Sequence, residues 1–69
     1  MKFLLKTDNT HGLPNAKAGD VVYSLRYADY GLASEDSRKT GVQHRSVTLD
    51  PDGGYPSFTH PVSQLEAQP

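Results

Sequence analysis

The chain of 69 residues contains no cysteine and no tryptophan. Without cysteine, neither a disulfide framework nor a cysteine-ligated zinc site can stabilise the fold, which fits a reducing compartment and equally a protein that is indifferent to redox state. No apolar run approaches the roughly 20 residues that a membrane-spanning helix needs. The apolar stretch between Met1 and Lys6 is too short for a secretory signal peptide and lacks its cleavage site. We therefore expect a soluble protein of the cytoplasm that does not associate with membranes.

An excess of charge of one sign is also missing. Seven basic and eight acidic residues give a formal net charge of −1. A protein that binds nucleic acid through its phosphates usually carries a clear basic excess. The charge balance therefore disfavours nucleic acid as a partner.

The chain is short and only moderately apolar, with hydrophobic residues at 35%. A domain of this size buries only about 60% of the surface that its unfolded chain exposes. We expect residues 1–69 to form a single small domain with one core. Because so small a core gains from burying one more face, both a monomer and a homodimer are compatible with the sequence.

Alternation of apolar and polar residues predicts short β-strands. The alternation is clearest over residues 21–27, whose β-branched and aromatic content favours a strand. Four further strands are expected over residues 2–6, 44–50, 55–60 and 65–66, followed by a frayed tail at 67–69. The predicted core comprises apolar residues of these strands, joined by Leu13 from the first loop: Phe3, Leu5, Val21, Tyr23, Leu25, Val47, Leu49, Phe58 and Leu65.

Turn-forming residues separate these strands. Gly19 and Asp20 lead into the second strand, and Asp-Pro-Asp-Gly-Gly at 50–54 predicts a tight hairpin, because Pro presets φ and Gly accepts a positive φ. Residues 28–43 show no alternation and are expected to form a long loop of about 16 residues.

One helical turn is expected within this long loop. Ser34 can cap it, acidic residues follow at once, and basic residues stand near its end at Lys39, as the helix dipole favours. Gly41 would terminate it.

The order of these elements resembles that of SH3-like barrels over most of the chain. In such barrels a Gly-Asp pair often precedes the second strand, as Gly19-Asp20 does, and a Pro-led single turn joins the last two strands, as residues 61–64 would. The resemblance implies an all-β fold, a small SH3-like barrel of about five short strands with one long loop. The chain lacks the Ala-Leu-Tyr-Asp-Tyr-like segment and the Trp of the eukaryotic SH3 ligand groove, so binding of Pro-rich peptides is not implied.

A second resemblance is to small bacteriophage and prophage proteins. It is carried by the segments at 17–23, 29–33, 46–50 and 55–59. It implies a bacterial cytoplasm and an accessory role, with no defined activity.

Residues that could support catalysis or metal binding do not form a recognisable motif. His11, His44 and His60 lie far apart in the sequence, with no pair at the short spacing of metal ligands. The acidic turn at 50–54 is no EF-hand loop, because the position that needs a Glu holds Pro61. No nucleophile, base and orienting group are brought together by their spacing. We expect no metal, no cofactor and no enzymatic activity.

The residues with the strongest case for binding lie in and around the long loop. Tyr30 is placed at its mouth, because tyrosine combines apolar contact area with a polar tip and is enriched in interfaces. Basic residues nearby either join it in a cluster or simply keep a solvated loop soluble. The predicted protein-binding residues are Tyr27, Asp29, Tyr30, Arg38, Lys39 and Arg45.

We expect a non-enzymatic module that docks on another protein through residues 27–45, with an exposed sheet edge as a second route. The alternative is a small nucleic-acid-binding barrel, supported by the aromatic residues beside Arg26, Arg38, Lys39 and Arg45. A small hydrolase or ligand carrier comes third, because it requires a pocket that the sequence does not indicate.

Overall fold

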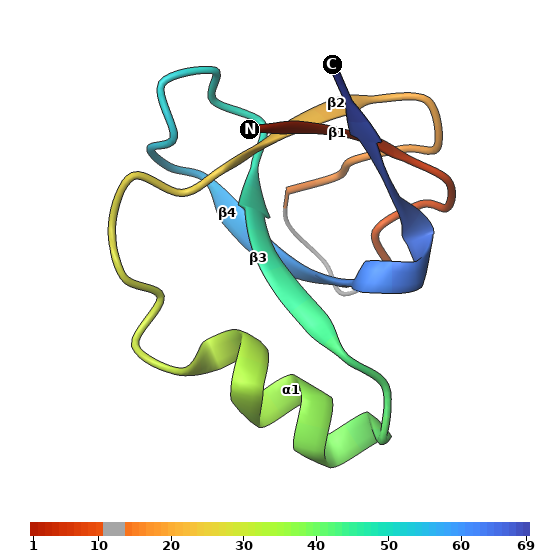
Figure 1. The fold of residues 1–69 in the computed structure, drawn as a ribbon, viewed down its shortest axis with the longest axis vertical. Helices are drawn as coiled ribbons and strands as arrows, with labels where there is room; N and C mark the ends of the chain where they lie inside the picture. The colour runs from red at the N-terminus through yellow and green to blue at the C-terminus, as the bar shows by residue number, and fades with distance from the viewer. Residues whose placement is uncertain (11–13) are drawn as a thin grey trace.

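Five short antiparallel strands, one α-helix and one 3₁₀-helix make up the fold in a computed structural model, which describes residues 1–10 and 14–69 (Figure 1). The α-helix is α1 (Leu32–Thr40), and the 3₁₀-helix η1 (Val62–Gln64) joins the last two strands. The predicted small all-β fold is confirmed. The strands are β1 (Lys2–Leu5), β2 (Val21–Ser24), β3 (His44–Thr48), β4 (Ser57–Pro61) and β5 (Leu65–Gln68).

All five strands belong to one sheet with the order β4-β3-β2-β1-β5. Successive strands are therefore neighbours up to β4, after which the chain crosses through η1 and returns β5 to the side of β1. β1 and β2 run across the top of the molecule while β3 and β4 descend steeply beneath them (Figure 1). Within the described residues β4 and β5 are each paired on one side only, so they are the two edges of a strongly bent sheet.

The core lies on the concave face of this sheet. In register, Phe3 stands opposite Val22 and Val47 stands opposite Phe58, so these four side chains point to the same side. Leu49 packs against the core from a partly buried position, and Ala16, which the sequence did not indicate, is fully buried. The buried apolar residues are Phe3, Leu5, Ala16, Val22, Val47, Phe58 and Leu65.

The face predicted for the second strand is wrong. Val22 is completely buried, whereas Val21 is 39% exposed. Val21 and Tyr23 pair with Leu4 and Lys2 on the outer face of the sheet. Valine at two successive positions makes the alternation equally compatible with both faces, and only the pairing of Val22 with Phe3 decides between them. Leu25 is partly buried and lies beyond the end of β2.

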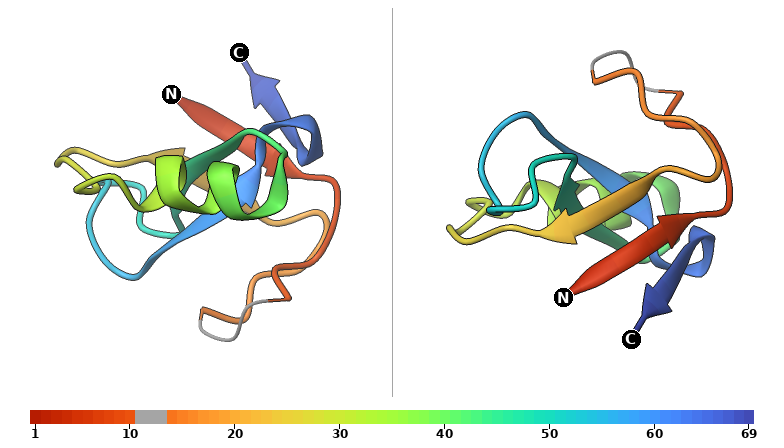
Figure 2. Two further views of the ribbon diagram at one scale, coloured as in Figure 1. Left: turned by 90° about the horizontal axis from the view of Figure 1, so that it is seen from below. Right: turned by 90° about the horizontal axis from the view of Figure 1, so that it is seen from above.

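The segment predicted as a loop with one helical turn contains a nine-residue helix instead. Gly31 (φ 86°) precedes α1 and Gly41 (φ 74°) ends it, with the Gly41 N–H donating to the carbonyl of Ser37. The predicted end at Gly41 is confirmed, but the helix begins before Ser34. None of its residues is buried. The sequence therefore lacks the periodic apolar residues from which an amphipathic helix is predicted. It lies against the outer face of the sheet (Figure 2).

The end of the chain is also more ordered than expected. Ala67 and Gln68 pair with Phe3 and Lys2, so these two residues belong to β5 and not to a frayed tail. His11 and Leu13 lie outside the described residues. No helix in the described part of the chain has the length and apolar character needed to cross a membrane.

Candidate protein-interaction surface

Three tyrosines gather at the end of the molecule where the long connection leaves β2. The rings of Tyr27 and Tyr55 are tilted against each other at 36°, with their centroids 5.0 Å apart. The charge of Tyr27, and to a lesser extent that of Tyr30, raises the pKa of the Tyr55 hydroxyl above its ordinary value of 10. Tyr30 lies three residues after Tyr27, on the same connection between β2 and α1. We name Tyr27, Tyr30 and Tyr55 the tyrosine cluster.

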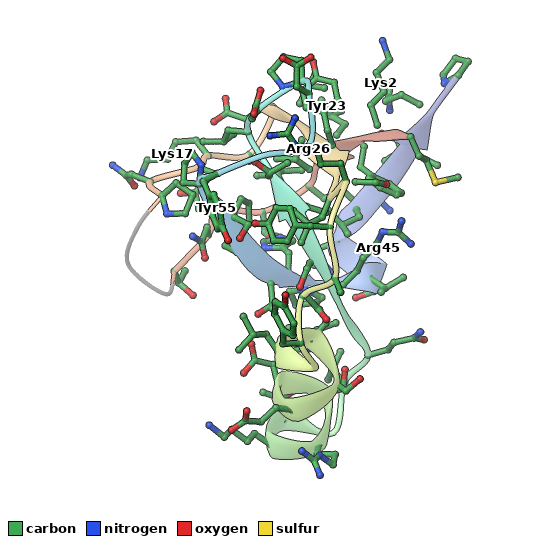
Figure 3. All side chains as sticks on the ribbon, turned by 90° about the vertical axis from the view of Figure 1, so that its left-hand side faces the viewer. Lys2, Lys17, Tyr23, Arg26, Arg45 and Tyr55 are labelled. Atoms are coloured by element: carbon green, nitrogen blue, oxygen red, sulfur yellow. The ribbon has the colours of Figure 1, made fainter. Side chains whose placement is uncertain are left out.

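In the tyrosine cluster, the Tyr27 side chain is held by a hydrogen bond, whereas the Tyr30 and Tyr55 side chains are exposed. The Tyr27 hydroxyl donates to the Ser57 Oγ at 3.0 Å, which ties that ring to the start of β4. Tyr55 is 76% exposed (Figure 3) and Tyr30 is 93% exposed. Two large aromatic side chains are thus presented to solvent beside a third that is partly buried.

The hairpin between β3 and β4 brings Tyr55 to its place. The Asp50 carboxylate accepts hydrogen bonds from the N–H groups of Asp52 and Gly54, which closes the turn. The turn then docks on the residues that follow β2, where the Arg26 N–H donates to the Gly53 carbonyl at 3.0 Å. Tyr55 follows this docked turn, and its ring therefore lies against that of Tyr27 in the segment after β2.

Asp29 holds the segment around Tyr30 in place through hydrogen bonds. Its carboxylate accepts hydrogen bonds from the Ser46 hydroxyl at 2.6 Å and from the N–H groups of Gly31 and Ala33 at 3.0 and 3.2 Å. These bonds, that of Ser46 foremost, lower the pKa of Asp29. The carboxylate therefore satisfies free N–H groups at the start of α1 and ties this end of the helix to β3. This contact gives Asp29 a supporting role beneath Tyr30.

The three predicted basic residues are divided between two elements, with Arg38 and Lys39 on α1 and Arg45 on β3. Lys39 pairs with Glu35 at 3.3 Å along the exposed side of α1, and Arg38 is exposed on the same helix. Arg45 stands on β3, where it donates to the Ser24 Oγ at 2.9 Å and its guanidinium lies 5.1 Å from the centre of the Phe3 ring. Of the six predicted binding residues, the structure brings Tyr27, Asp29 and Arg45 to one open hollow of about 300 Å³, and it adds Tyr55 beside Tyr27.

No protein-family model matches the chain, and no curated protein or solved structure is found to be similar to it. The functional argument therefore rests on the residues and their geometry.

A groove of about 460 Å³ separates α1 from the outer face of β3 and β4, next to the tyrosine cluster. Leu32, which is 56% exposed, stands at its edge, and Asp36 crosses it by accepting a hydrogen bond from the Thr59 hydroxyl. The Ser37 Oγ accepts a second bond from the His44 N–H at 2.8 Å. The groove is thus bridged by polar contacts that hold the helix to the sheet.

The two described histidines are engaged in separate contacts. The His44 Nδ1 donates to the Val42 carbonyl at 2.7 Å, and the His60 Nε2 lies 3.2 Å from the Thr7 Oγ1. In the described part of the chain, no three acidic or histidine side chains are grouped as a metal site would require.

Sequence reasoning missed Tyr55, although a signal for it exists. Tyr55 follows the Asp-Pro-Asp-Gly-Gly turn directly, and a tight hairpin places the next residue close to the end of the neighbouring strands. The contact with Tyr27 depends on how the turn docks on Arg26, which no local pattern specifies.

Proposed function

We propose that this protein is a non-enzymatic interaction module that binds another protein through the tyrosine cluster. The observation that carries the proposal is the backbone of Tyr30, whose φ is 55° while its side chain is 93% exposed. The left-handed conformation costs a residue other than glycine about 1–2 kcal/mol. Strain of this kind is concentrated at functional positions, because the surroundings must compensate for it.

The composition of the surface supports a protein as the partner. Tyrosine is enriched in protein interfaces and among the residues that dominate binding energy, because it offers a large contact area at a small entropic cost. Leu32 continues the exposed apolar area from Tyr30 into the groove beside α1. The resemblance to small phage and prophage proteins favours an accessory role in which the partner belongs to the bacterial host.

The substitution Tyr30→Asn tests the proposal. Asparagine tolerates the left-handed conformation, so we expect the free energy of unfolding to stay equal or to rise by up to about 1 kcal/mol. We expect that host proteins retained by the immobilised wild type, quantified by mass spectrometry, are lost with this variant. The trade of binding for stability is typical of a strained functional residue.

The matched control is Val42→Ser, which removes an exposed apolar side chain at the far end of α1. It should retain the same proteins as the wild type. Retention of those proteins by Tyr30→Asn would contradict the proposal, because the tyrosine cluster would then not contribute to capture.

Nucleic-acid binding is a second candidate, supported by a different set of side chains. Lys2 stands directly opposite Tyr23 in the register of β1 and β2, which places a cation and an aromatic side chain side by side on the outer face of the sheet. Aromatic residues interspersed with cations are typical of single-strand binding surfaces. The net charge of −1 weighs against this candidate.

Fluorescence anisotropy with a labelled oligonucleotide of mixed sequence separates the two candidates. Nucleic-acid binding predicts an affinity that falls steeply with salt and weakens with Arg26→Gln. An unchanged anisotropy at low salt would remove this candidate and leave the protein partner.

A further inference from the structure

A hollow of about 430 Å³ opens between β1 and β5 on one side and the start of β3 on the other. The N–H of Val62 donates to the carbonyl of Gln43 at 2.9 Å, which joins η1 to the segment before β3 and closes one end of the hollow. Most of its lining is apolar. The apolar residues are Met1, Phe3, Val62, Leu65 and Ala67.

Arg45 stands at the rim of this hollow as a fixed cation. It projects from β3 towards the side of the molecule that carries β5 (Figure 3). The ring of Phe3, 5.1 Å from the guanidinium, and the Ser24 Oγ, 2.9 Å from one nitrogen, hold it in place. A guanidinium carries five N–H donors, so a single bond to Ser24 leaves most of them for another acceptor.

Arg45 forms no ion pair with any of the described residues, although Asp29 lines a neighbouring hollow with it. The ion pairs in this part of the chain are those of Lys17 with Asp8 and of Lys39 with Glu35, and neither involves Arg45. Glu66 is near in sequence to the lining, but it alternates with Leu65 and Ala67 and so faces the opposite side of β5. An anionic ligand would therefore meet no carboxylate already paired with this guanidinium.

The lining favours a ligand that combines an anion with an apolar group. The guanidinium lies against the Phe3 ring, which is itself part of the apolar lining, so an anion and an apolar group must reach the hollow together. A volume of about 430 Å³ is at the small end of ligand pockets, which suits one or two residues. Within a peptide, an apolar residue carries its own carboxylate only at the carboxy terminus.

We propose that this hollow binds the carboxy-terminal residue of a partner protein. The apolar side chain fills the space lined by Phe3, Val62 and Leu65, and the terminal carboxylate pairs with Arg45 through parallel hydrogen bonds. None of the three tyrosines lines this hollow, and the proposal does not depend on the function proposed for them.

The test compares two peptides of the same sequence, acetyl-Gly-Ser-Gly-Leu-Leu with a free carboxylate and with a terminal amide. Each is titrated into the isotope-labelled protein and followed by amide NMR shifts. We expect the acid to shift residues around the hollow, with an affinity roughly tenfold higher than that of the amide, because charge-assisted bonds are lost in the amide. Equal affinities, or no shifts around the hollow at about 1 mM peptide, would overturn the proposal.

Variants locate the interaction without relying on one substitution. Arg45→Gln should remove the preference for the acid, while Arg38→Gln, the same charge change on the exposed side of α1, should leave it intact. Ala67→Leu fills the hollow without altering Arg45 and should abolish binding of the acid. Wild-type affinity in either Arg45→Gln or Ala67→Leu would contradict the site. Binding of the acid by Tyr30→Asn at wild-type affinity is expected, which keeps this test independent of the tyrosine cluster.

Discussion

Gly53 occupies a position that no other residue can fill without displacing the chain. Its φ is 81°, and a Cβ built there would lie 2.8 Å from the backbone nitrogen of Arg26 and 2.9 Å from the carbonyl oxygen of Ser24. Both the backbone conformation and the close approach therefore require glycine. The contact is what docks the hairpin turn on the end of β2.

We expect Gly53→Ala to lower the free energy of unfolding by at least about 2 kcal/mol, measured by urea denaturation. Part of the loss comes from the left-handed conformation and part from contact with backbone atoms that cannot move aside. Gly19→Ala is the matched control, because its φ is 94° but nothing lies within 4 Å of the added Cβ. It should lose only the conformational part, about 1 kcal/mol. Equal losses in the two variants would show that the close approach contributes nothing.

Single residues also show where sequence reasoning succeeds. Tyr30 was predicted as a surface residue at the mouth of the loop, and it is the most exposed aromatic of the cluster. Tyr55 was assigned to a strand, whereas β4 begins only at Ser57. The partnership of Tyr55 with Tyr27 is a tertiary contact between two loops, and it leaves no trace in local composition.

Helix α1 is an element held in place by polar contacts. It has no buried residue, and its bonds to the sheet run from Asp29 to Ser46, from Asp36 to Thr59 and from Ser37 to His44. A helix usually docks through an apolar stripe, and that stripe is what a sequence reveals. Because this stripe is absent, the sequence shows the glycine that ends the helix but not its true length.

We expect Asp29→Ala to destabilise the protein by about 1 kcal/mol at pH 7, the usual effect of removing a group that caps a helix. The folded protein lowers the pKa of Asp29, so its stabilisation is complete above the ordinary aspartate pKa of about 3.9 and is lost as the pH falls through the lower folded value. The difference between wild type and variant, measured by urea denaturation across the pH range, should vanish on the acid side.

Asp29→Asn is the control for the charge, because the amide oxygen still accepts a bond from an N–H group. It should retain part of the stabilisation and lose its pH dependence. A difference between wild type and Asp29→Ala that persists unchanged in acid would mean that the carboxylate acts by its shape and not by its charge.

On the scale of the whole molecule, the order of the strands along the chain was predictable, as were the core residues of every strand except β2. Turn residues at 19–20 and 50–54 separate the segments that become strands. These segments are rich in residues of high β-propensity. The face of β2 depends on its register with β1, which pairs Val22 with Phe3. The hollow beside Arg45 depends on how β5 returns to β1, a long-range feature that periodicity does not encode.

Because α1 has no buried residue, its sequence can vary more freely in evolution than that of the core strands. A segment with no buried residue can lengthen, shorten or exchange its sequence while the core stays intact, provided that its two ends remain anchored. The entropic cost of closing a loop grows only slowly with its length, so these changes are inexpensive in stability. Mutation can therefore sample new sequences between Gly31 and Gly41, apart from Asp36 and Ser37, which bond to the sheet, while the core stays unchanged.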